Sequence, residues 1–531
     1  MFPPSDFAPR NKERNDLQVL ATKPPACVDT RHQLTQQKVI LFAAFGSLFS
    51  GYSLNIITAT LGQPTFYSSL NLVPSPTLRD YNHTTAIIGA ANGLLFAGGF
   101  AGGYFGTFMA GWCGDKIGRV KGFRVAAVVG IVGGALQRAN VNQAMALGRM
   151  LFLDAAIHIT ADAIAPLDQY LVARFITGFA TGHTVAAMPI YYVEVAPPHS
   201  RGLMSGAHGV FINMGYAVAT WLGFACFHAS ETSFAWRFPN AVLINWCLSL
   251  LVGSFFIPES PRWLVSNDHH DRALNVLCKL HRDKRDPDNS VAHQELELIK
   301  RQVDADRMAS QQGVWKQLFR QKTYRKRIVL AAMVLLGGQN LGILVINNYS
   351  ALLYQSLSFS ASEALIFAAC YNTWATLSNM VGAVISARVG RRRVMVLPLL
   401  IARYSETFSR TYAAVAIVFL FLYALSYSCI DTSQFSVAAE IFPSHLRSRG
   451  TSFAISLLFL ADTLWLELGA TAMQTIGWKY YLVFVSLGVV HTVYLFFKLP
   501  GTSDLALEEI DALFGKAPKG HIEDETSRRA L

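Results

Sequence analysis

The sequence predicts an all-α membrane protein in which twelve transmembrane helices form two six-helix, pseudo-symmetric bundles. Three observations predict this fold class: the composition, a series of apolar stretches long enough to span a bilayer, and motifs that recur in both halves of the chain. Of the 531 residues, 52% are hydrophobic and 15% are charged, whereas a soluble protein carries about 25% charged residues. The mean hydropathy of +0.31 also indicates a lipid environment. This composition argues against a soluble enzyme, a disordered scaffold and a disulfide-rich secreted domain.

Cysteine content and charge narrow the class further. The seven cysteines are scattered and include no CxxC pair, so they indicate neither a disulfide framework nor a zinc site, and we expect no metal. The net charge of +11 comes from short basic clusters between apolar stretches. In a membrane protein such clusters report orientation. The expected partner is therefore the lipid bilayer and not a nucleic acid.

The lengths of the predicted spans are close to the ~20 residues that a helix needs to cross a bilayer. We place them at 39–61, 86–112, 125–143, 170–192, 203–227, 240–257, 328–354, 362–386, 394–411, 412–437, 451–474 and 480–499. No apolar signal-peptide region precedes them. The resulting domains are a cytoplasmic tail (1–38), an N-terminal bundle (39–257), a cytoplasmic linker with short helices (258–327), a C-terminal bundle (328–499) and a second cytoplasmic tail (500–531).

Two stretches depart from this regular pattern. Residues 144–169 are semi-apolar, but a span there would move the basic linker to the outside, so we interpret them as an enlarged outer loop. The ninth span includes Arg403, Glu406 and Arg410, and these charges must be buried against neighbouring helices. A defective gene model would explain both stretches, so an impaired carrier is one alternative.

The distribution of Lys and Arg predicts the orientation. Basic residues are concentrated around Lys116–Arg124, at Arg391–Arg393 and through the linker, and the positive-inside rule places these segments in the cytoplasm. Both termini are then cytoplasmic, and we expect the plasma membrane as the location. Asn82-His83-Thr84 is a glycosylation sequon on the predicted outer face.

An internal repeat with a period of roughly 245 residues relates the two halves. Glu194 followed by Arg201-Gly202 recurs as Glu440 followed by Arg449-Gly450. Two such halves joined by a long segment predict a two-fold arrangement about the membrane normal, with a site between the halves.

Together these motifs resemble the sugar-porter branch of the major facilitator superfamily, and fungal members in particular. The motifs are Gly114-Asp-Lys-Ile-Gly-Arg119, Arg174-Phe-Ile-Thr-Gly178, Glu194 with Arg201-Gly202, Pro258-Glu-Ser-Pro-Arg-Trp263, Glu440-Ile-Phe-Pro443 with Arg449-Gly450, and Leu507-Glu-Glu-Ile510. The resemblance implies the major facilitator fold and alternating-access transport of a sugar or related polyol. It implies neither an enzyme nor a cofactor.

The charged motif residues predict a cytoplasmic gate whose ion pairs favour the outward-facing state and break when the inside opens. Ordinary positive-inside anchoring is the alternative for the basic residues, but the glutamates at matching repeat positions favour the gate. Ala387 stands where the family carries an acidic residue in the second half. The ion pairs of the gate in that half are therefore expected to be weaker. The predicted gate residues are Asp115, Arg119, Glu194, Arg201, Glu259, Arg262, Arg391, Glu440 and Arg449.

The predicted substrate site combines amides with an aromatic ring, because sugars need hydrogen-bonding groups and apolar faces. Its candidates are Gln339, Asn347, Asn348, Asn372, Asn379, His208 and Phe435. Phe435 replaces a tryptophan of the family, and the family's Asn-Trp pair in the eleventh span is missing. The site is thus expected to be sugar-like in position and altered in chemistry. Packing between helices is the alternative for each amide.

Coupling to protons is a separate question. Proton-driven members read Gly-Tyr-Asp in the first span, but this chain reads Gly51-Tyr52-Ser53, and serine carries no proton at physiological pH. Facilitated diffusion is therefore favoured over proton symport. Asp431, His183, His208, Asp462 and Glu467 could carry the proton instead, and Asp431 is the best of these candidates. His183 is a second candidate, although a packing role is the simpler interpretation of this histidine.

Another alternative is a nutrient sensor on the same fold. Such sensors typically need a long cytoplasmic tail, and the short segment after Pro500 favours transport.

Overall fold

The computed structural model describes residues 30–63, 65–66, 98–138, 166–196, 201–228, 234–281, 286, 288–309, 314–356, 359–389, 410–475 and 479–498. Helices dominate this part of the chain, which contains no strand. The sequon at Asn82, the gate candidate Arg391, nearly all of the expected outer loop, almost the whole ninth span and the C-terminal tail lie outside the described residues.

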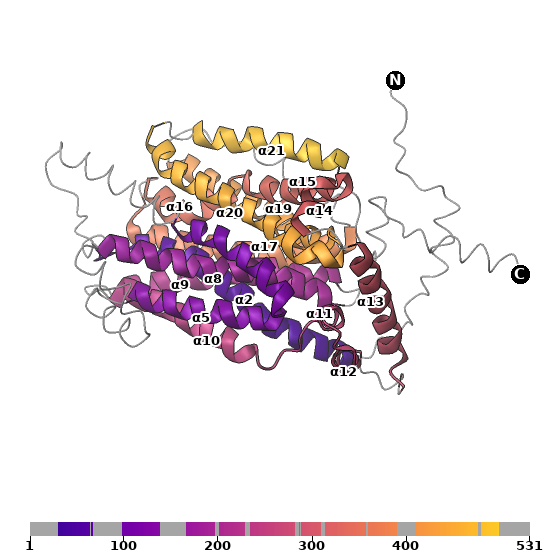
Figure 1. Cartoon of the computed structure of the whole chain (residues 1–531). Helices are drawn as coiled ribbons and strands as arrows, with labels where there is room; N and C mark the ends of the chain where they lie inside the picture. Colours follow the sequence, from indigo (N-terminus) through magenta and orange to yellow (C-terminus); the bar gives the residue numbers. More distant parts are fainter. Residues whose placement is uncertain are drawn as a thin grey trace, which may run out of the picture.

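The two halves form two layers of helices. The N-terminal half consists of α2 (Thr30–Leu61), helix 98–116, α5 (Arg119–Arg138), α8 (Pro166–Val195), α9 (Arg201–Phe227) and α10 (Phe234–Gly253). The C-terminal half consists of α15 (Lys322–Gln339), α16 (Ile343–Ser356), α17 (Ala361–Val389), α19 (Arg410–Glu440), α20 (Ser444–Thr475) and α21 (Lys479–Lys498). The helices of the two halves run roughly along one common direction (Figure 1).

The helices that connect the halves lie at one end of the bundles (Figure 1). They are α11 (Pro261–Ser266), α12 (His270–Leu280), α13 (Ser290–Ala309) and α14 (Val314–Arg320). Pro261 starts α11, and the Ser260 hydroxyl accepts a hydrogen bond from the backbone N–H of Trp263, which is an N-cap. Buried side chains such as Leu277 and Leu296 give this group a small core of its own.

Lipid contact explains the exposed apolar side chains. On α21, Val490 is 63% exposed and Phe497 is 72% exposed. Within the described residues, four stretches (119–137, 206–227, 322–350 and 444–469) are long and apolar enough by themselves to cross a bilayer. An apolar surface of this kind is stable in hydrocarbon and unfavourable in water.

Several boundaries differ from those predicted: α2, α5, α10 and α20 begin six to nine residues earlier than expected, and the seventh span is interrupted. Helix α2 begins at Thr30, inside the expected tail, because a polar helix can continue beyond the membrane without an apolar signal. The seventh span, predicted as one helix over 328–354, is broken between Gln339 and Ile343. Gly342 has φ +81°, a conformation that glycine adopts without strain and that commonly ends a helix.

One neighbouring side chain bonds to the backbone at this break, and another bonds to an adjacent side chain. The hydroxyl of Tyr423 donates to the carbonyl of Leu341 over 2.8 Å, and the Trp465 indole donates to the Asn340 amide oxygen over 2.9 Å. A non-helical backbone at membrane depth is stable only when protein groups or water supply such bonds. The break therefore positions the polar residues on either side of it.

Glycines bring helix 98–116 into backbone contact with α8. A Cβ atom on Gly102 would lie 2.0 Å from the Phe175 carbonyl oxygen, and one on Gly106 would lie 2.0 Å from that of Phe179. Small residues permit this approach between membrane helices. Gly102 and Gly106 therefore serve the packing of these two helices.

Candidate functional site

A cavity lies between the two halves. Helices α2, α8 and α9 and helix 98–116 contribute one side of its wall, whereas α15, α16, α17, α19 and α20 contribute the other. Its interior offers about 60 Å³ of space to the centres of water-sized spheres. The polar lining residues are Asn213, Tyr216, Gln339, Asn347, Asn379, Tyr427, Asp431, Gln434 and Asp462.

Four of the seven predicted substrate residues line this cavity. Gln339 ends α15, and Asn347 lies on α16 just beyond the helix break. Asn379 on α17 and Phe435 on α19 complete this group. Two of these four predicted residues, Gln339 and Asn347, therefore lie on either side of the break in the seventh span.

The other three predicted residues lie away from the wall. Asn348 and Asn372 each donate from Nδ2 to the carbonyl four residues earlier, at Leu344 and Ala368. His208 is fully buried, and its Nδ1 lies 2.8 Å from the Ser47 hydroxyl. The ring of His208 packs edge-on against Phe435 with the centroids 5.0 Å apart. His208 therefore lies behind a lining residue.

Two carboxylates lie on the cavity wall. Asp431 accepts a hydrogen bond from Asn213 Nδ2 over 2.6 Å and another from Gln434 Nε2 over 3.0 Å. Because Asn213 belongs to α9 and Asp431 to α19, the first bond joins the two halves. Asp462 on α20 is 2% exposed, and its Oδ1 makes no hydrogen bond to a described residue.

Sequence reasoning did not place Asn213, Gln434, Tyr216 or Tyr427 at the site. One signal was available: Gln434 follows Asp431 by three residues, so both occupy one face of a helix. Asn213 carried no comparable signal, because its partner is 218 positions away.

The coupling candidate His183 lies within the N-terminal half. It is 1% exposed, and neither ring nitrogen makes a hydrogen bond to a described residue. A Cβ built on Gly122 of α5 would lie 3.1 Å from its Nε2. Its position between α8 and α5 favours a packing role.

Ser53 is bonded within the same half. Its hydroxyl accepts from Thr181 over 2.8 Å, and its carbonyl accepts from Arg174 Nη1 over 2.9 Å. Arg174 is 1% exposed, and the structure describes no ion pair for it. The position that is acidic in proton-driven members is therefore neutral and faces a buried guanidinium.

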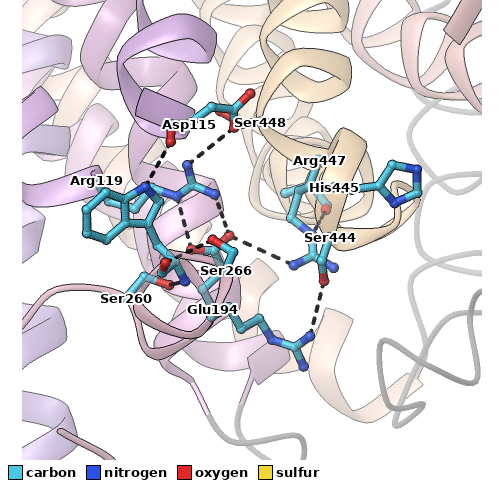
Figure 2. A network of polar contacts seen from close by, with 12 residues as sticks. Asp115, Arg119, Glu194, Ser260, Ser266, Ser444, His445, Arg447 and Ser448 are labelled. Atoms are coloured by element: carbon cyan, nitrogen blue, oxygen red, sulfur yellow. Dashed lines mark hydrogen bonds and ion pairs between the residues drawn. The ribbon is translucent and has the colours of Figure 1, made fainter. Parts of the chain in front are cut away.

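The candidate gate residues lie in contact at the end of the bundles that carries the linker helices. Arg119 and Glu194 form a bidentate pair, with Nε–Oε2 at 3.1 Å and Nη2–Oε1 at 2.9 Å. Their side chains are 6% and 2% exposed. Arg447 of the C-terminal half approaches the same carboxylate, with Nη1–Oε1 at 4.0 Å, so this cluster extends across both halves (Figure 2).

Other gate contacts also connect the halves. Arg449 Nε lies 2.9 Å from Asp115 Oδ2, and the Ser448 hydroxyl donates to the Gly111 carbonyl over 3.0 Å. Arg262 of the linker donates to the Ser444 hydroxyl over 3.2 Å. These contacts must separate if the halves move apart at this end.

Glu259 and Glu440 have different surroundings. The Glu259 carboxylate accepts from the backbone N–H groups of Arg119 and Val120, at 2.9 Å and 3.2 Å, so it caps α5 and interacts favourably with the helix dipole. Glu440 is 3% exposed at the end of α19. Arg201 begins α9, but its side chain is outside the described part of the structure.

Electrostatics keep the central pair ionised. Glu194 lies beyond the predicted span 170–192. Burial opposes its ionisation, but attraction to Arg119 and the hydrogen bonds from Arg119 outweigh burial and lower the pKa of Glu194 below its ordinary value. Arg119 donates two hydrogen bonds to this carboxylate, so the two charges of the pair stabilise each other. Both groups therefore remain charged at neutral pH.

Comparisons with known proteins agree with this geometry. Residues 39–514 match the family described as sugar (and other) transporter. A transporter named criB from Aspergillus cristatus is 29% identical over 490 residues, covering 89% of this chain and 92% of that protein. A quinate permease from Neurospora terricola is 24% identical, covering 90% and 88%.

Solved structures support the same fold. The proton:xylose symporter XylE bound to 6-bromo-6-deoxy-D-glucose superposes with a TM-score of 0.75 at 20% identity, covering 91% of this chain and 100% of the other. The inward-open structure of XylE from E. coli gives 0.61, also at 20% identity, covering 90% and 99%.

The fold and the central cavity define a carrier of the major facilitator superfamily, embedded in a membrane. The chain belongs to its sugar (and other) transporter family. The predictions of fold class, of family and of a carrier rather than an enzyme are thereby confirmed.

Proposed function

We propose that this protein carries an uncharged polyhydroxylated solute, a sugar or related polyol, across the plasma membrane by alternating access, with both termini in the cytoplasm. The observation that carries the proposal is the cavity between the halves, whose wall combines amides, tyrosine hydroxyls and aromatic rings. Hydroxyl groups of a sugar can bond to such amides, and its C–H faces can pack on Phe435.

The closed gate supports alternating access. Pairs such as Arg449 with Asp115 join the halves on the linker side of the cavity, and solute release to the cytoplasm requires their separation. A pair that is partly exposed contributes about 1 kcal/mol or less. A contribution of this size shifts the equilibrium between the closed and the open gate without preventing the gate from opening.

An anionic solute fits the cavity poorly. No Lys, Arg or His occurs among the described lining residues, and two of these residues are aspartates. Like charges in a low-dielectric cavity repel strongly. The quinate permease relative therefore does not by itself favour an organic acid as the solute of this chain.

Facilitated diffusion is the simplest mode of transport, because Ser53 cannot carry a proton. Proton symport is a second candidate, favoured by the partly buried carboxylate of Asp431 and the buried carboxylate of Asp462 on the wall. A nutrient sensor would bind the same solute without useful flux.

Uptake measurements test the proposal. Purified full-length protein in proteoliposomes is offered labelled hexoses, pentoses, disaccharides and polyols, with and without a protonophore. We expect saturable uptake of at least one neutral solute. Binding without flux would indicate a sensor, and impermeability to every neutral solute by a folded protein would overturn the proposal.

A further inference from the structure

Helix α14 carries two exposed aromatic rings on one face. Trp315 is 41% exposed and Phe319 is 45% exposed. The two residues are four positions apart and so share a face of the helix, and their rings stack with the centroids 6.2 Å apart and an interplanar angle of 12°. Gln317 and Leu318, which lie between them in sequence, are buried and fix the helix against the bundles. The exposed rings therefore form a rigid apolar surface.

The same rings contact both halves of the protein. Phe453 of α20 lies edge-on to Phe319 and to Trp315, with the centroids 5.3 Å and 6.2 Å apart. Phe108 of helix 98–116 lies 6.5 Å from Trp315. These contacts hold one side of each ring, whereas the other side remains accessible. The accessible side requires an apolar cover, because bare aromatic surface is unfavourable in water.

Basic side chains accompany the rings. Five of them are exposed, and none of the five forms an ion pair with a described residue. They are Lys316, Arg320, Lys322, Arg325 and Lys326. The chain contains no Asp or Glu between Asp306 and Glu363, so this segment does not neutralise its own charge. A concentration of one sign of charge attracts a surface of the opposite sign.

The position of these residues along α15 corresponds to the headgroup layer of a bilayer. The stretch 322–350 is apolar enough to cross a membrane, and the predicted seventh span begins at Ile328. Arg325 and Lys326 then lie about 3–5 Å from Ile328 along the helix axis, within a headgroup layer about 5–8 Å thick. Val329 is 46% exposed, so the exposed surface of α15 changes from basic to apolar within one turn. Tryptophan is enriched at this level of membrane proteins.

We propose that α14 and the first turn of α15 bind anionic phospholipids of the leaflet on the linker side. Trp315 and Phe319 pack against the upper part of the acyl chains, and the five basic side chains contact the phosphate and the other charged groups of the headgroups. A zwitterionic phospholipid has no net charge with which to neutralise these side chains. The inference goes beyond the proposed function, because it requires a membrane carrier but no particular solute.

Native mass spectrometry of the purified full-length protein in a neutral detergent tests the inference. Phosphatidylglycerol and phosphatidylcholine with identical acyl chains are titrated separately, and binding of the first lipid gives an apparent Kd for each. The test variant combines Lys322→Gln, Arg325→Gln and Lys326→Gln. The matched control removes three exposed charges from α12 and α13, by Arg272→Gln, Lys279→Gln and Arg301→Gln. A ring variant, Trp315→Ala with Phe319→Ala, keeps every charge.

The wild type is expected to prefer phosphatidylglycerol. Each Lys or Arg near an anionic surface contributes about fivefold to the affinity, so the test variant should weaken phosphatidylglycerol binding by about tenfold or more and leave phosphatidylcholine binding unchanged. The control charges lie outside the proposed surface, and their removal should change phosphatidylglycerol binding by less than about twofold because of screening. The ring variant should weaken the binding of both lipids.

Four results would overturn the inference. The first is equal affinity of the wild type for the two lipids. The second is an equal loss in the test variant and the matched control, because net charge alone would then explain binding. The third is unchanged binding in the ring variant. The fourth is displacement of the lipid by soluble glycerophosphate at equal concentration, which would indicate a site for a free anion. The measurement uses no solute, so none of these results bears on the proposed function.

Discussion

Arg449 on α20 pairs with Asp115 on helix 98–116, with Nε and Oδ2 2.9 Å apart, and so joins the two halves of the carrier. These residues are 334 positions apart in sequence. Their side chains are 26% and 28% exposed, so solvent weakens the pair, and it can open during a transport cycle.

Removing this pair is expected to favour the inward-open state. The exposed fractions limit its contribution to about 1 kcal/mol, so Arg449→Ala changes the population up to about fivefold. The measurement is labelling of Ser452→Cys, at a buried position facing Gly111, by an impermeant maleimide on the cytoplasmic side. We expect faster labelling with Arg449→Ala and no change with Lys300→Ala, which breaks an exposed pair within α13. Equal rates in all variants would contradict the gate.

The Arg119–Glu194 pair is buried, and its loss is expected to affect stability. Glu194→Ala leaves the Arg119 charge without its bidentate partner, at a cost of roughly 3–5 kcal/mol. Thermal unfolding in detergent, followed by tryptophan fluorescence, measures the effect. A double variant, Arg119→Leu with Glu194→Leu, removes both charges and should unfold at a higher temperature than Glu194→Ala. If the double variant is the less stable protein, the argument from the buried charge is wrong.

The same pair predicts a pH dependence. The pKa of Glu194 is lowered in the folded protein from an ordinary value of 4.5, so its stabilisation is complete above that value and disappears as pH falls through the folded pKa. The difference in unfolding temperature between wild type and Glu194→Gln should be constant from about pH 8 to pH 5 and shrink in more acidic buffer. A difference that changes near neutral pH would show that another group controls it.

Asn379 and Asn372 provide a matched test of the cavity. Both lie on α17, and each donates from Nδ2 to the carbonyl four residues earlier, but only Asn379 lines the cavity. One lost hydrogen bond is worth about 0.5–1.5 kcal/mol, so Asn379→Ala should raise KM for the solute by roughly two- to tenfold. Asn372→Ala should change KM much less. Equal effects would indicate that both act through packing.

Gly106 and Gly98 provide a matched test of helix packing. A Cβ on Gly106 would lie 2.0 Å from the Phe179 carbonyl oxygen, whereas the nearest atom to a Cβ on Gly98 is 3.7 Å away. Gly106→Ala must separate helix 98–116 from α8, and overpacking of this kind costs about 1–3 kcal/mol. Unfolding in detergent should shift for Gly106→Ala and stay unchanged for Gly98→Ala. Similar unfolding of both variants would contradict the contact.

Much of the fold could be predicted from the sequence because lipid imposes a simple rule: a spanning helix needs about twenty apolar residues. The repeat around Glu194 and Glu440, together with the basic clusters, then predicted two related halves and their orientation. The break at Gly342 was harder to recognise, since the apolar pattern continues through it and only the left-handed backbone of one glycine reveals it.

The residue types of the site followed from the sequence, but their placement did not. Asn372 and Asn379 are the same residue type on the same helix, and only the packing of the helices determines that Asn379 lines the cavity. The bond between Asn213 and Asp431 spans 218 positions, a separation at which composition and periodicity say nothing about contact. Sequence by itself therefore determined a two-bundle membrane carrier with a charged gate and a polar interior. Only the tertiary structure decided which charges meet and that the Oδ1 of Asp462 lacks a described partner, because such contacts depend on how distant helices pack.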